Sequence, residues 1–360
     1  MALARLRTPT SLDLIAVNNE GIVSALNISD GVPLWTVRSL NQKRAIRNPL
    51  PFVLMRSRAG LDNVVVFPQT SAVMLDGRTG REIWRVALPA TAASATAIED
   101  VAEAHIFVVD NSLQKIFILD TEGRISNNVL QPNPAVGAPA AIEYLTSRAI
   151  MVALNDGRLE IFDPTGKLIG SAHAGDVATT APLFVRTARR NLLIVGTRSG
   201  LKALAADDLK PLGTVTIKGD SPRGDLLAKD LDGDGVAEVV MFTEHGRLVV
   251  VRSEDGNILW DADAQYAETA TFFDVNSDGV IDVVTASREY FAAAFSGRDG
   301  TLLWEEKAPL SVVANHSTIF DARPVLMAPG PGGTLVIDPD LFHNGLRAVG
   351  LNSLLAPRHK

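Results

Sequence analysis

The feature that most constrains the fold is an internal repeat of about 44 residues that runs along the whole chain. Segments 13–35 and 62–84 align without a gap at a shift of 49 residues, which pairs Gly31 with Gly80 and Trp35 with Trp84. The pattern returns at steps of 43, 43, 43, 47, 44 and 42 residues. The 360 residues therefore contain eight units, and in repeats of this length each unit packs on its neighbours.

Each unit has the pattern of four short strands. Two apolar runs flank a polar turn, and a second turn leads to a third run. In segment 157–162 apolar and polar residues alternate with the period of a strand. A further run, rich in Ala, Gly and Thr, precedes each pair, and residues 2–8 take its place in the first unit. We predict an all-β fold: an eight-bladed β-propeller with four antiparallel strands per blade and the small innermost strand at the axis.

The repeat also predicts the domain organisation. Residues 1–350 are expected to form one propeller, followed by a C-terminal tail of residues 351–360. The expected blades are 1–47, 48–90, 91–133, 134–174, 175–220, 221–264, 265–310 and 311–350.

A glycine stands four residues before a tryptophan in four of the units. Glycine adopts the positive φ that a tight turn needs, and the tryptophan on the following outer strand is expected to lie flat against the next blade. These tryptophans are Trp35, Trp84, Trp260 and Trp304. In two of the units that lack the tryptophan, its position is occupied by Gly170 and Gly213.

Composition limits the classes of function. The chain is 46% hydrophobic and 21% charged, so it can bury a large core. A net charge of −7 argues against non-specific binding to nucleic acid or to an anionic membrane. There is no cysteine, which excludes disulfides, thiolate metal sites, a cysteine nucleophile and lipid attachment to cysteine. No apolar run approaches the roughly 20 residues of a membrane span, and residues 1–10 lack a secretory apolar core. We expect a soluble chain whose targeting segment is absent from this sequence.

Two acidic segments lie between the expected first and second strands of units six and seven. Oxygens at positions one, three and five of a curled loop converge, glycine at six permits the turn, and the carbonyl at seven and carboxylate at nine can complete a Ca²⁺ shell. The residues at these positions are Asp230, Asp232, Asp234, Val236 and Glu238, and then Asp274, Asn276, Asp278, Val280 and Asp282. A tight turn without metal is the alternative. Because the pattern occurs in two adjacent units, we predict two structural calcium sites.

The sequence contains no other recognisable catalytic or ligand-binding motif. The six histidines are scattered, with no pair at metal-ligand spacing. There is no Gly-x-Ser-x-Gly elbow, phosphate loop or dinucleotide fingerprint. We therefore predict no catalytic residue and no cofactor-binding residue. A pair of carboxylates that face each other across the central channel is an alternative that the sequence leaves open.

Segment 24–35 resembles the PQQ-like, quinoprotein-type propeller repeat at Ala25, Asn27, Asp30, Gly31 and Trp35. This resemblance covers nearly the whole chain and implies the propeller fold. The acidic segments resemble the calcium loops of FG-GAP and integrin-α propellers, which implies the residues named above as Ca²⁺ ligands. PQQ-dependent alcohol dehydrogenases also resemble the repeat, but their chains are longer and they commonly place a vicinal disulfide against the cofactor. No PQQ is expected.

The resemblance extends to BamB-like outer-membrane assembly proteins, which have eight PQQ-like blades and bind partners through loops at one face. It implies a non-catalytic protein-interaction scaffold, part of a cell-envelope or surface assembly. This chain departs from that family in lacking a cysteine for lipid attachment and in having the two acidic loops, which Ca²⁺ is expected to stiffen. The expected location is extracytoplasmic: periplasmic, outer-membrane-associated or secreted. The expected partners are other proteins of a larger assembly, not nucleic acid. A quinoprotein-like or carbohydrate-active enzyme that uses the channel mouth is the alternative.

Overall fold

The structure is a computed structural model of the chain. It describes residues 2–17, 22–27, 32–38, 40, 51–99, 104–145, 147–265, 267–287, 291–307, 327–330, 333–337 and 348–350. Within these ranges, no helix has the length and apolar character that a membrane crossing requires. The predicted C-terminal tail, 351–360, lies outside the described residues.

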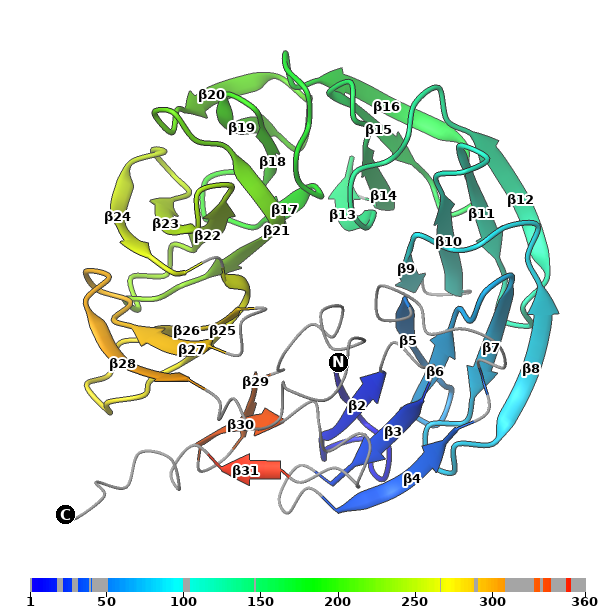
Figure 1. Ribbon diagram of the computed structural model, residues 1–360. Helices are drawn as coiled ribbons and strands as arrows, with labels where there is room; N and C mark the ends of the chain where they lie inside the picture. The colour runs from blue at the N-terminus through cyan, green and yellow to red at the C-terminus, as the bar shows by residue number, and fades with distance from the viewer. Residues whose placement is uncertain are drawn as a thin grey trace.

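Four-stranded antiparallel sheets follow one another around a central axis (Figure 1), and each consists of four strands that are consecutive in the sequence. Blades 1 to 3 are β1 (Ala2–Ala4), β2 (Asp13–Val17), β3 (Val23–Leu26) and β4 (Pro33–Val37); β5 (Phe52–Arg56), β6 (Asp62–Val66), β7 (Ser71–Leu75) and β8 (Glu82–Ala87); and β9 (Ser94–Glu99), β10 (Ala104–Asp110), β11 (Lys115–Leu119) and β12 (Ile125–Leu130).

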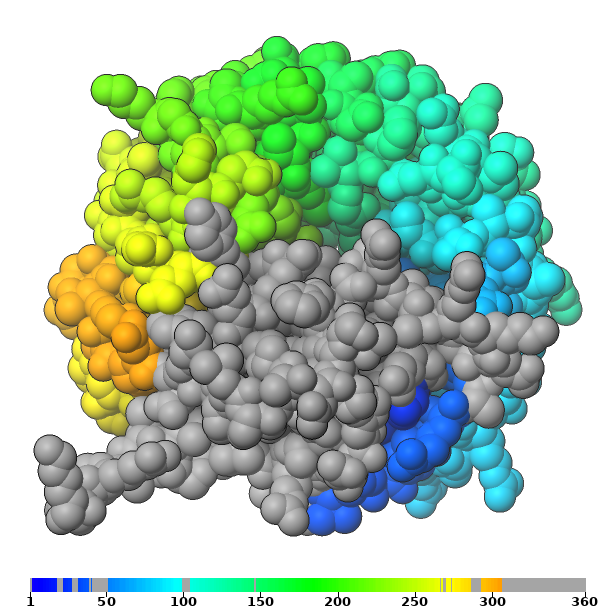
Figure 2. All heavy atoms as spheres, viewed as in Figure 1, coloured from blue at the N-terminus to red at the C-terminus, as the bar shows by residue number. Residues whose placement is uncertain are grey.

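Blades 4 to 7 have the same strand order and follow in sequence around the rim (Figure 2). They are β13 (Ala140–Tyr144), β14 (Ser147–Ala153), β15 (Arg158–Phe162) and β16 (Leu168–His173); β17 (Leu183–Val185), β18 (Leu192–Thr197), β19 (Gly200–Ala205) and β20 (Pro211–Val215); β21 (Pro222–Lys229), β22 (Glu238–Thr243), β23 (Arg247–Arg252) and β24 (Ile258–Asp263); and β25 (Ala267–Phe273), β26 (Asp282–Ser287), β27 (Phe291–Phe295) and β28 (Leu302–Lys307).

The predicted all-β propeller with four antiparallel strands per blade is confirmed, but the predicted number of eight blades is wrong. Among the described residues, the structure has seven such blades. The described residues of the last unit form a three-stranded sheet of β29 (Met327–Gly330), β30 (Gly333–Ile337) and β31 (Ala348–Gly350), and β29 lies against β25. Pro329 in β29 pairs with Thr334 but has no amide hydrogen to donate to the ladder, which weakens this sheet. Segment 311–326, where its innermost strand was predicted, lies outside the described residues.

The hydrophobic core lies between neighbouring blades. Every residue of β2, β3, β18 and β22 is buried, whereas the outer strands β8, β12 and β20 are composed of exposed and partly buried residues. One cluster joins Val240 and Phe242 of blade 6 to Ala293 and Phe295 of blade 7. Full burial of a large aliphatic or aromatic side chain contributes about 1.5–3 kcal/mol, so packing between blades stabilises the ring.

Three of the four predicted tryptophans, Trp35, Trp84 and Trp260, connect their outer strand to the next blade; the indole nitrogen of Trp304 is buried and has no hydrogen-bond partner among the described residues. Trp35 donates its indole N–H to the carbonyl of Gly77 (2.8 Å), and a Cβ on Gly80 would lie only 2.7 Å from the Trp35 ring. The same arrangement recurs for Trp84 with Thr121 and Gly123, and for Trp260 with Gly297 and Gly300. In blade 3, which lacks the tryptophan, Asn127 donates its side-chain amide to the carbonyl of Thr165 (2.8 Å).

All blades run in the same direction around the axis. The loops that join each first strand to its second strand therefore open on one face of the ring, which we call the loop face. The two acidic segments, between β21 and β22 and between β25 and β26, lie on this face.

Candidate functional site

The first acidic loop is held in shape by its own carboxylates. Asp230, directly after β21, accepts the amide N–H groups of Gly233 (2.8 Å) and Gly235 (3.0 Å), one on each carboxylate oxygen. Both glycines have positive φ, at 80° and 84°. Asp234 accepts the amide of Val236 on its Oδ1 (2.7 Å). These bonds curl the loop around Asp230, as the spacing predicted.

The second loop has the same backbone conformation. Asp274 accepts the amides of Asp278 (3.1 Å) and Gly279 (3.0 Å), again one on each oxygen. Ser277 stands where the first loop has Gly233 and also has a positive φ, at 62°. Asp278 in turn accepts the amide of Val280 on its Oδ1 (2.8 Å). Two segments 44 residues apart thus form equivalent turns in adjacent blades.

The ninth position of each loop is the buried first residue of the second strand. Glu238 accepts the amide of Leu231 on Oε2, and Asp282 accepts the amide of Val275 on Oδ2, both at 2.9 Å. The loops differ in the other oxygen. Asp282 Oδ1 accepts the amide of Gly297 (3.2 Å), but Glu238 Oε1 is buried and has no hydrogen-bond partner among the described residues, on a residue that is only 1% exposed.

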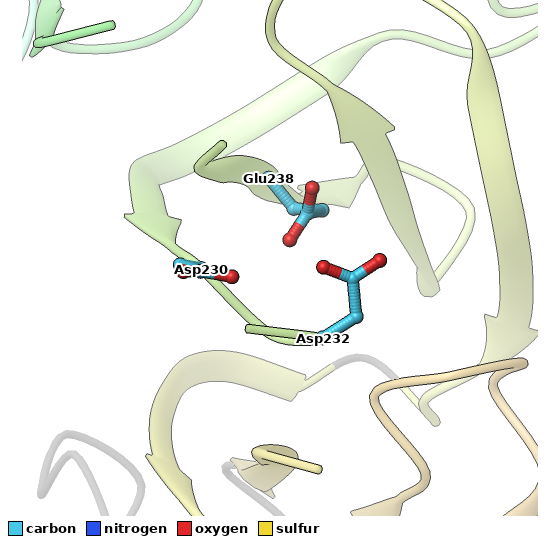
Figure 3. Close-up of side chains that lie close together, drawn as sticks. All are labelled: Asp230, Asp232 and Glu238. Atoms are coloured by element: carbon cyan, nitrogen blue, oxygen red, sulfur yellow. The ribbon is translucent and has the colours of Figure 1, made fainter. Parts of the chain in front are cut away.

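The unpartnered oxygen belongs to a cluster of carboxylates. Oxygens of Asp230, Asp232 and Glu238 all lie within 4.8 Å of one another, and the carboxylates of Asp232 and Glu238 face each other across the loop (Figure 3). Asp234 is not part of this group. In the described part of the second loop no three carboxylates approach so closely. There the Asn276 side-chain amide donates to Asp278 Oδ2 (3.1 Å), and Asn276 Oδ1 accepts the Asp278 amide (3.0 Å).

The electrostatics of both ninth positions favour a cation. Burial raises the pKa of Glu238, and the nearby carboxylates of Asp232, Asp234 and Asp230 raise it further. Burial likewise raises the pKa of Asp282, with Asp278 and Asp274 adding to the effect. A carboxylate that is buried among other carboxylates is unfavourable unless a positive charge compensates it.

In blades 1 and 2, an arginine of the same blade supplies the positive charge to the carboxylate at the equivalent position, a relation that was not predicted from the sequence. Asp13 and Asp62 occupy the position of Glu238 in their own repeats. Arg7 donates to Asp13 (2.7 Å) and Arg56 donates to Asp62 (2.9 Å). The signal was present, because each arginine precedes its aspartate by six residues and the two pairs are 49 residues apart. The head of the second strand is thus a place where the fold binds a cation.

The first loop fits a single divalent metal ion. Ca²⁺ takes six to eight oxygens at about 2.3–2.6 Å, so two oxygens on opposite sides of the ion lie roughly 5 Å apart. The spread of up to 4.8 Å among Asp230, Asp232 and Glu238 is within that limit. Glu238 Oε1 offers a buried oxygen that is otherwise unsatisfied. The donor set of the first loop therefore suits Ca²⁺, and that of the second loop suits it less well.

A pocket of about 390 Å³ lies at the ends of the first strands of blades 1 to 5, on the loop face. Sequence reasoning did not find it, because its residues come from five repeats and have no common motif. We call it the arginine pocket after its charged lining residues, which are Arg5, Arg56, Asp62, Glu143, Arg148 and Arg186.

Comparisons with known proteins agree on the fold. The sequence matches the family described as outer membrane protein assembly factor BamB over residues 19–231 and 197–340. No curated protein matches the chain. Among solved structures, BamB from Moraxella catarrhalis superposes with a TM-score of 0.66 at 17% identity and covers 100% of this chain and 95% of its own.

Two further structures have similar folds. The computationally designed Ika8 protein gives a TM-score of 0.64 at 14% identity, over 94% of this chain and 93% of its own. The dihydro-heme d1 dehydrogenase NirN gives 0.69 at 13% identity, over 94% of this chain and 70% of its own. At these identities the likeness shows the fold alone. The predicted PQQ-like, BamB-like repeat is confirmed by the sequence match, and the likeness to FG-GAP calcium loops stays a prediction.

Proposed function

The chain belongs to the family described as outer membrane protein assembly factor BamB, and from this premise we propose that it is a non-catalytic scaffold that binds other proteins in outer-membrane assembly. The observation that carries the proposal is the extent of the match, which reaches from residue 19 to residue 340. A rigid ring whose loops open on one face suits such a role, because loops on a rigid support present side chains to a partner in fixed positions.

The location follows from the same premise. We propose that the protein works outside the cytoplasm, at the periplasmic side of the outer membrane, as the name of its family implies. The net charge of −7 supports protein partners over nucleic acid. The similar structure of a dehydrogenase does not argue for catalysis here, because a likeness at 13% identity carries no activity to this chain.

We also propose that the acidic loops bind Ca²⁺ and that the ion stiffens the loop face. In the first loop Asp230, Asp232 and Glu238 would hold the ion, with Asp234 and the carbonyl of Val236 as further oxygen donors. In the second loop the donors would be Asp274, Asn276, Asp278, Asp282 and the carbonyl of Val280. We expect the first site to bind more tightly, because both oxygens of Asp282 already accept backbone amides whereas Glu238 Oε1 accepts none from the described residues.

A pull-down from the native cell envelope tests the scaffold proposal. The tagged protein is used as bait in about 2 mM Ca²⁺, above the roughly 10⁻⁴–10⁻³ M affinities typical of extracellular sites, and again in chelator. We expect one or more envelope proteins in stoichiometric amount, identified by mass spectrometry, with a lower yield in chelator. Recovery of no stoichiometric partner in either buffer would contradict the scaffold. A partner recovered equally in both buffers would support the scaffold and refute the part assigned to Ca²⁺.

A further inference from the structure

The arginine pocket has a charge that differs from that of the protein as a whole. Four arginines and two carboxylates line it, which leaves two positive charges in excess on a chain whose net charge is −7. At about 390 Å³ it falls in the range of about 300–1,000 Å³ that is typical of ligand pockets. A concave site with an excess of arginine attracts and orients anionic groups.

Two of the four arginines are each paired with a carboxylate of the pocket. Arg186 donates to Glu143 (2.5 Å), and Glu143 lies directly opposite Arg148 in the β13–β14 ladder. Arg186 also lies over the ring of Phe184, 5.9 Å from the ring centroid. Glu143 thus orients the guanidinium of Arg186 from the next blade, and a guanidinium group held in this way is pre-organised to bind a carboxylate.

Asp62 performs the same role on the other side of the pocket. It accepts the Arg56 guanidinium on Oδ1 (2.9 Å) and the backbone amide of Arg5 on Oδ2 (2.7 Å). Asp62 therefore ties the end of the first strand of blade 1 to blade 2. The pocket arginines thus lie on strand ends that are joined in two pairs, blades 1 and 2 through Asp62 and blades 4 and 5 through Glu143.

The walls between the charges are apolar. Leu54 and Phe184, both partly buried, also line the pocket and offer apolar surface, whereas Ile98 and Ile142 are only 2% and 3% exposed and offer little. A ligand that satisfies both parts of this lining has carboxylates on a body with apolar groups. Arginine beside apolar and aromatic surface is the composition typical of protein-binding sites.

An exposed leucine lies beside the pocket. Leu145, at the tip between β13 and β14, is 63% exposed and has a φ of 47°. The left-handed conformation costs a non-glycine residue about 1 kcal/mol or more, and such strain is concentrated at functional sites. Leu145 is two residues from Glu143 and three from Arg148, so apolar contact is available immediately next to the arginines.

We propose that the arginine pocket binds an acidic, extended segment of a partner polypeptide, whose carboxylates engage the pocket arginines and whose apolar side chains contact the pocket wall and Leu145. This inference rests on the proposed scaffold function and specifies the chemistry of the partner. The exposed apolar residue beside the charged pocket is what favours a polypeptide over a small anion.

Direct binding of synthetic peptides tests the inference on the purified, full-length protein. The probe is a dye-labelled peptide of about ten residues in which pairs of Glu alternate with pairs of Leu, so that each side of the extended peptide carries both residue types. Its counterpart has Gln in place of every Glu. Fluorescence anisotropy in about 0.15 M salt limits non-specific attraction between distant charges. We expect the Glu peptide to bind at least about tenfold more tightly than the Gln peptide.

Matched double variants locate the site. Arg5→Gln with Arg186→Gln removes two pocket charges, and Arg85→Gln with Arg124→Gln removes two from the outer strands and turns. We expect the pocket variant to bind the Glu peptide about tenfold more weakly and the outer variant to bind as the wild type does. Leu145→Ser is expected to weaken binding about threefold. Unchanged melting temperatures show that each variant is folded.

Several outcomes would overturn the proposal: no binding of the Glu peptide, equal binding of the Gln peptide, or an equal loss in the outer variant. If the pocket variant loses affinity for the Glu peptide but Leu145→Ser binds it as tightly as the wild type does, the apolar contact is refuted and the pocket is a site for anions alone. The two proposals fail separately. An envelope partner that is captured equally by wild type and by the pocket variant would leave the scaffold in place and reject this pocket as its binding site.

Discussion

Gly80 is the residue at which the backbone of blade 2 meets the indole ring of blade 1. Its φ is 70°, and a Cβ would lie 2.7 Å from two atoms of Trp35. We expect Gly80→Ala to lower the free energy of unfolding by about 2–4 kcal/mol, because it adds backbone strain to a clash with a large, partly buried ring. Chemical denaturation measures the change.

Gly219 provides the control for this substitution. Its φ is 73°, almost the same, but nothing lies within 4 Å of the position that a Cβ would occupy. Gly219→Ala is therefore expected to cost only about 1 kcal/mol, the strain alone. Equal losses in the two variants would show that contact with the tryptophan ring contributes nothing at Gly80.

Asp220 gives a pH-dependent contribution to stability. Burial by itself raises the pKa of Asp220, but donors from Thr243, His245 and Ser221 outweigh burial and hold the pKa below its ordinary value. The Ser221 amide lies at 2.8 Å and the His245 ring at 2.9 Å. Since the folded-state pKa is lowered, the stabilisation is present above the unfolded-state pKa and is lost as the pH falls through the folded-state pKa.

We expect Asp220→Asn to lower the free energy of unfolding by about 1–2 kcal/mol at pH 7, because hydrogen bonds to a charged acceptor are replaced by weaker ones. The difference from wild type is expected to begin to shrink near pH 4, where aspartate titrates in the unfolded chain, and to be lost as the pH falls through the lower folded-state pKa. Urea denaturation at several pH values measures it. A difference that stays constant down to the acid limit would contradict the assignment.

At the scale of the element, the acidic loops connect two strands whose ends carry negative charge. We expect Ca²⁺ at about ten times its dissociation constant to raise the free energy of unfolding by about 1.4 kcal/mol per site, and the melting temperature by roughly 1–3 °C. Asp232→Asn removes one carboxylate of the cluster in the first loop and is expected to abolish most of that site's share. Differential scanning calorimetry with and without Ca²⁺ measures both.

Asp255→Asn is the matched control. Asp255 lies in an exposed turn of blade 6, where it accepts the backbone amide of Asn257 (2.9 Å), and its replacement changes the net charge by the same amount. The control variant is expected to respond to Ca²⁺ as the wild type does. A Ca²⁺ response that is equally reduced in both variants would indicate general charge screening and remove the support for a site at Asp232.

At the scale of the whole molecule, the ring is held together by packing between blades. One isolated bridge, Thr180 to Gly224, pairs described residues of two blades; all ladders lie within single sheets. We expect a four-residue Gly–Ser insertion between Lys218 and Gly219 to lower the free energy of unfolding by less than about 1 kcal/mol, because lengthening a surface connection costs little loop entropy. The same insertion between Arg78 and Thr79, in the turn on which Trp35 lies, is expected to cost several times more. Equal losses of stability at the two positions would contradict the conclusion that packing between blades holds the ring together.

The sequence predicted what depends on short-range pattern. The repeat and its alternating runs predicted the four-stranded blades, and the Gly–Trp spacing predicted the contact that Trp35, Trp84 and Trp260 make with the next blade. It overestimated the number of blades, because counting repeats does not reveal whether a unit completes a four-stranded sheet, and the described residues of the last unit form three strands. The spacing of the acidic loops predicted their turns but not which carboxylates converge, since this depends on side-chain directions. The arginine pocket depends on the closure of the ring and has no signature in any single repeat.

Because each four-stranded blade is one uninterrupted stretch of sequence, a gene for such a protein can change by whole modules. Unequal recombination between two repeats adds or removes a complete sheet and leaves every remaining ladder intact. The blades that become neighbours must then form a new contact with each other, such as an indole ring packed on the turn of the following blade. Blade number is therefore free to vary over evolutionary time, while the joints between blades are where selection for stability acts.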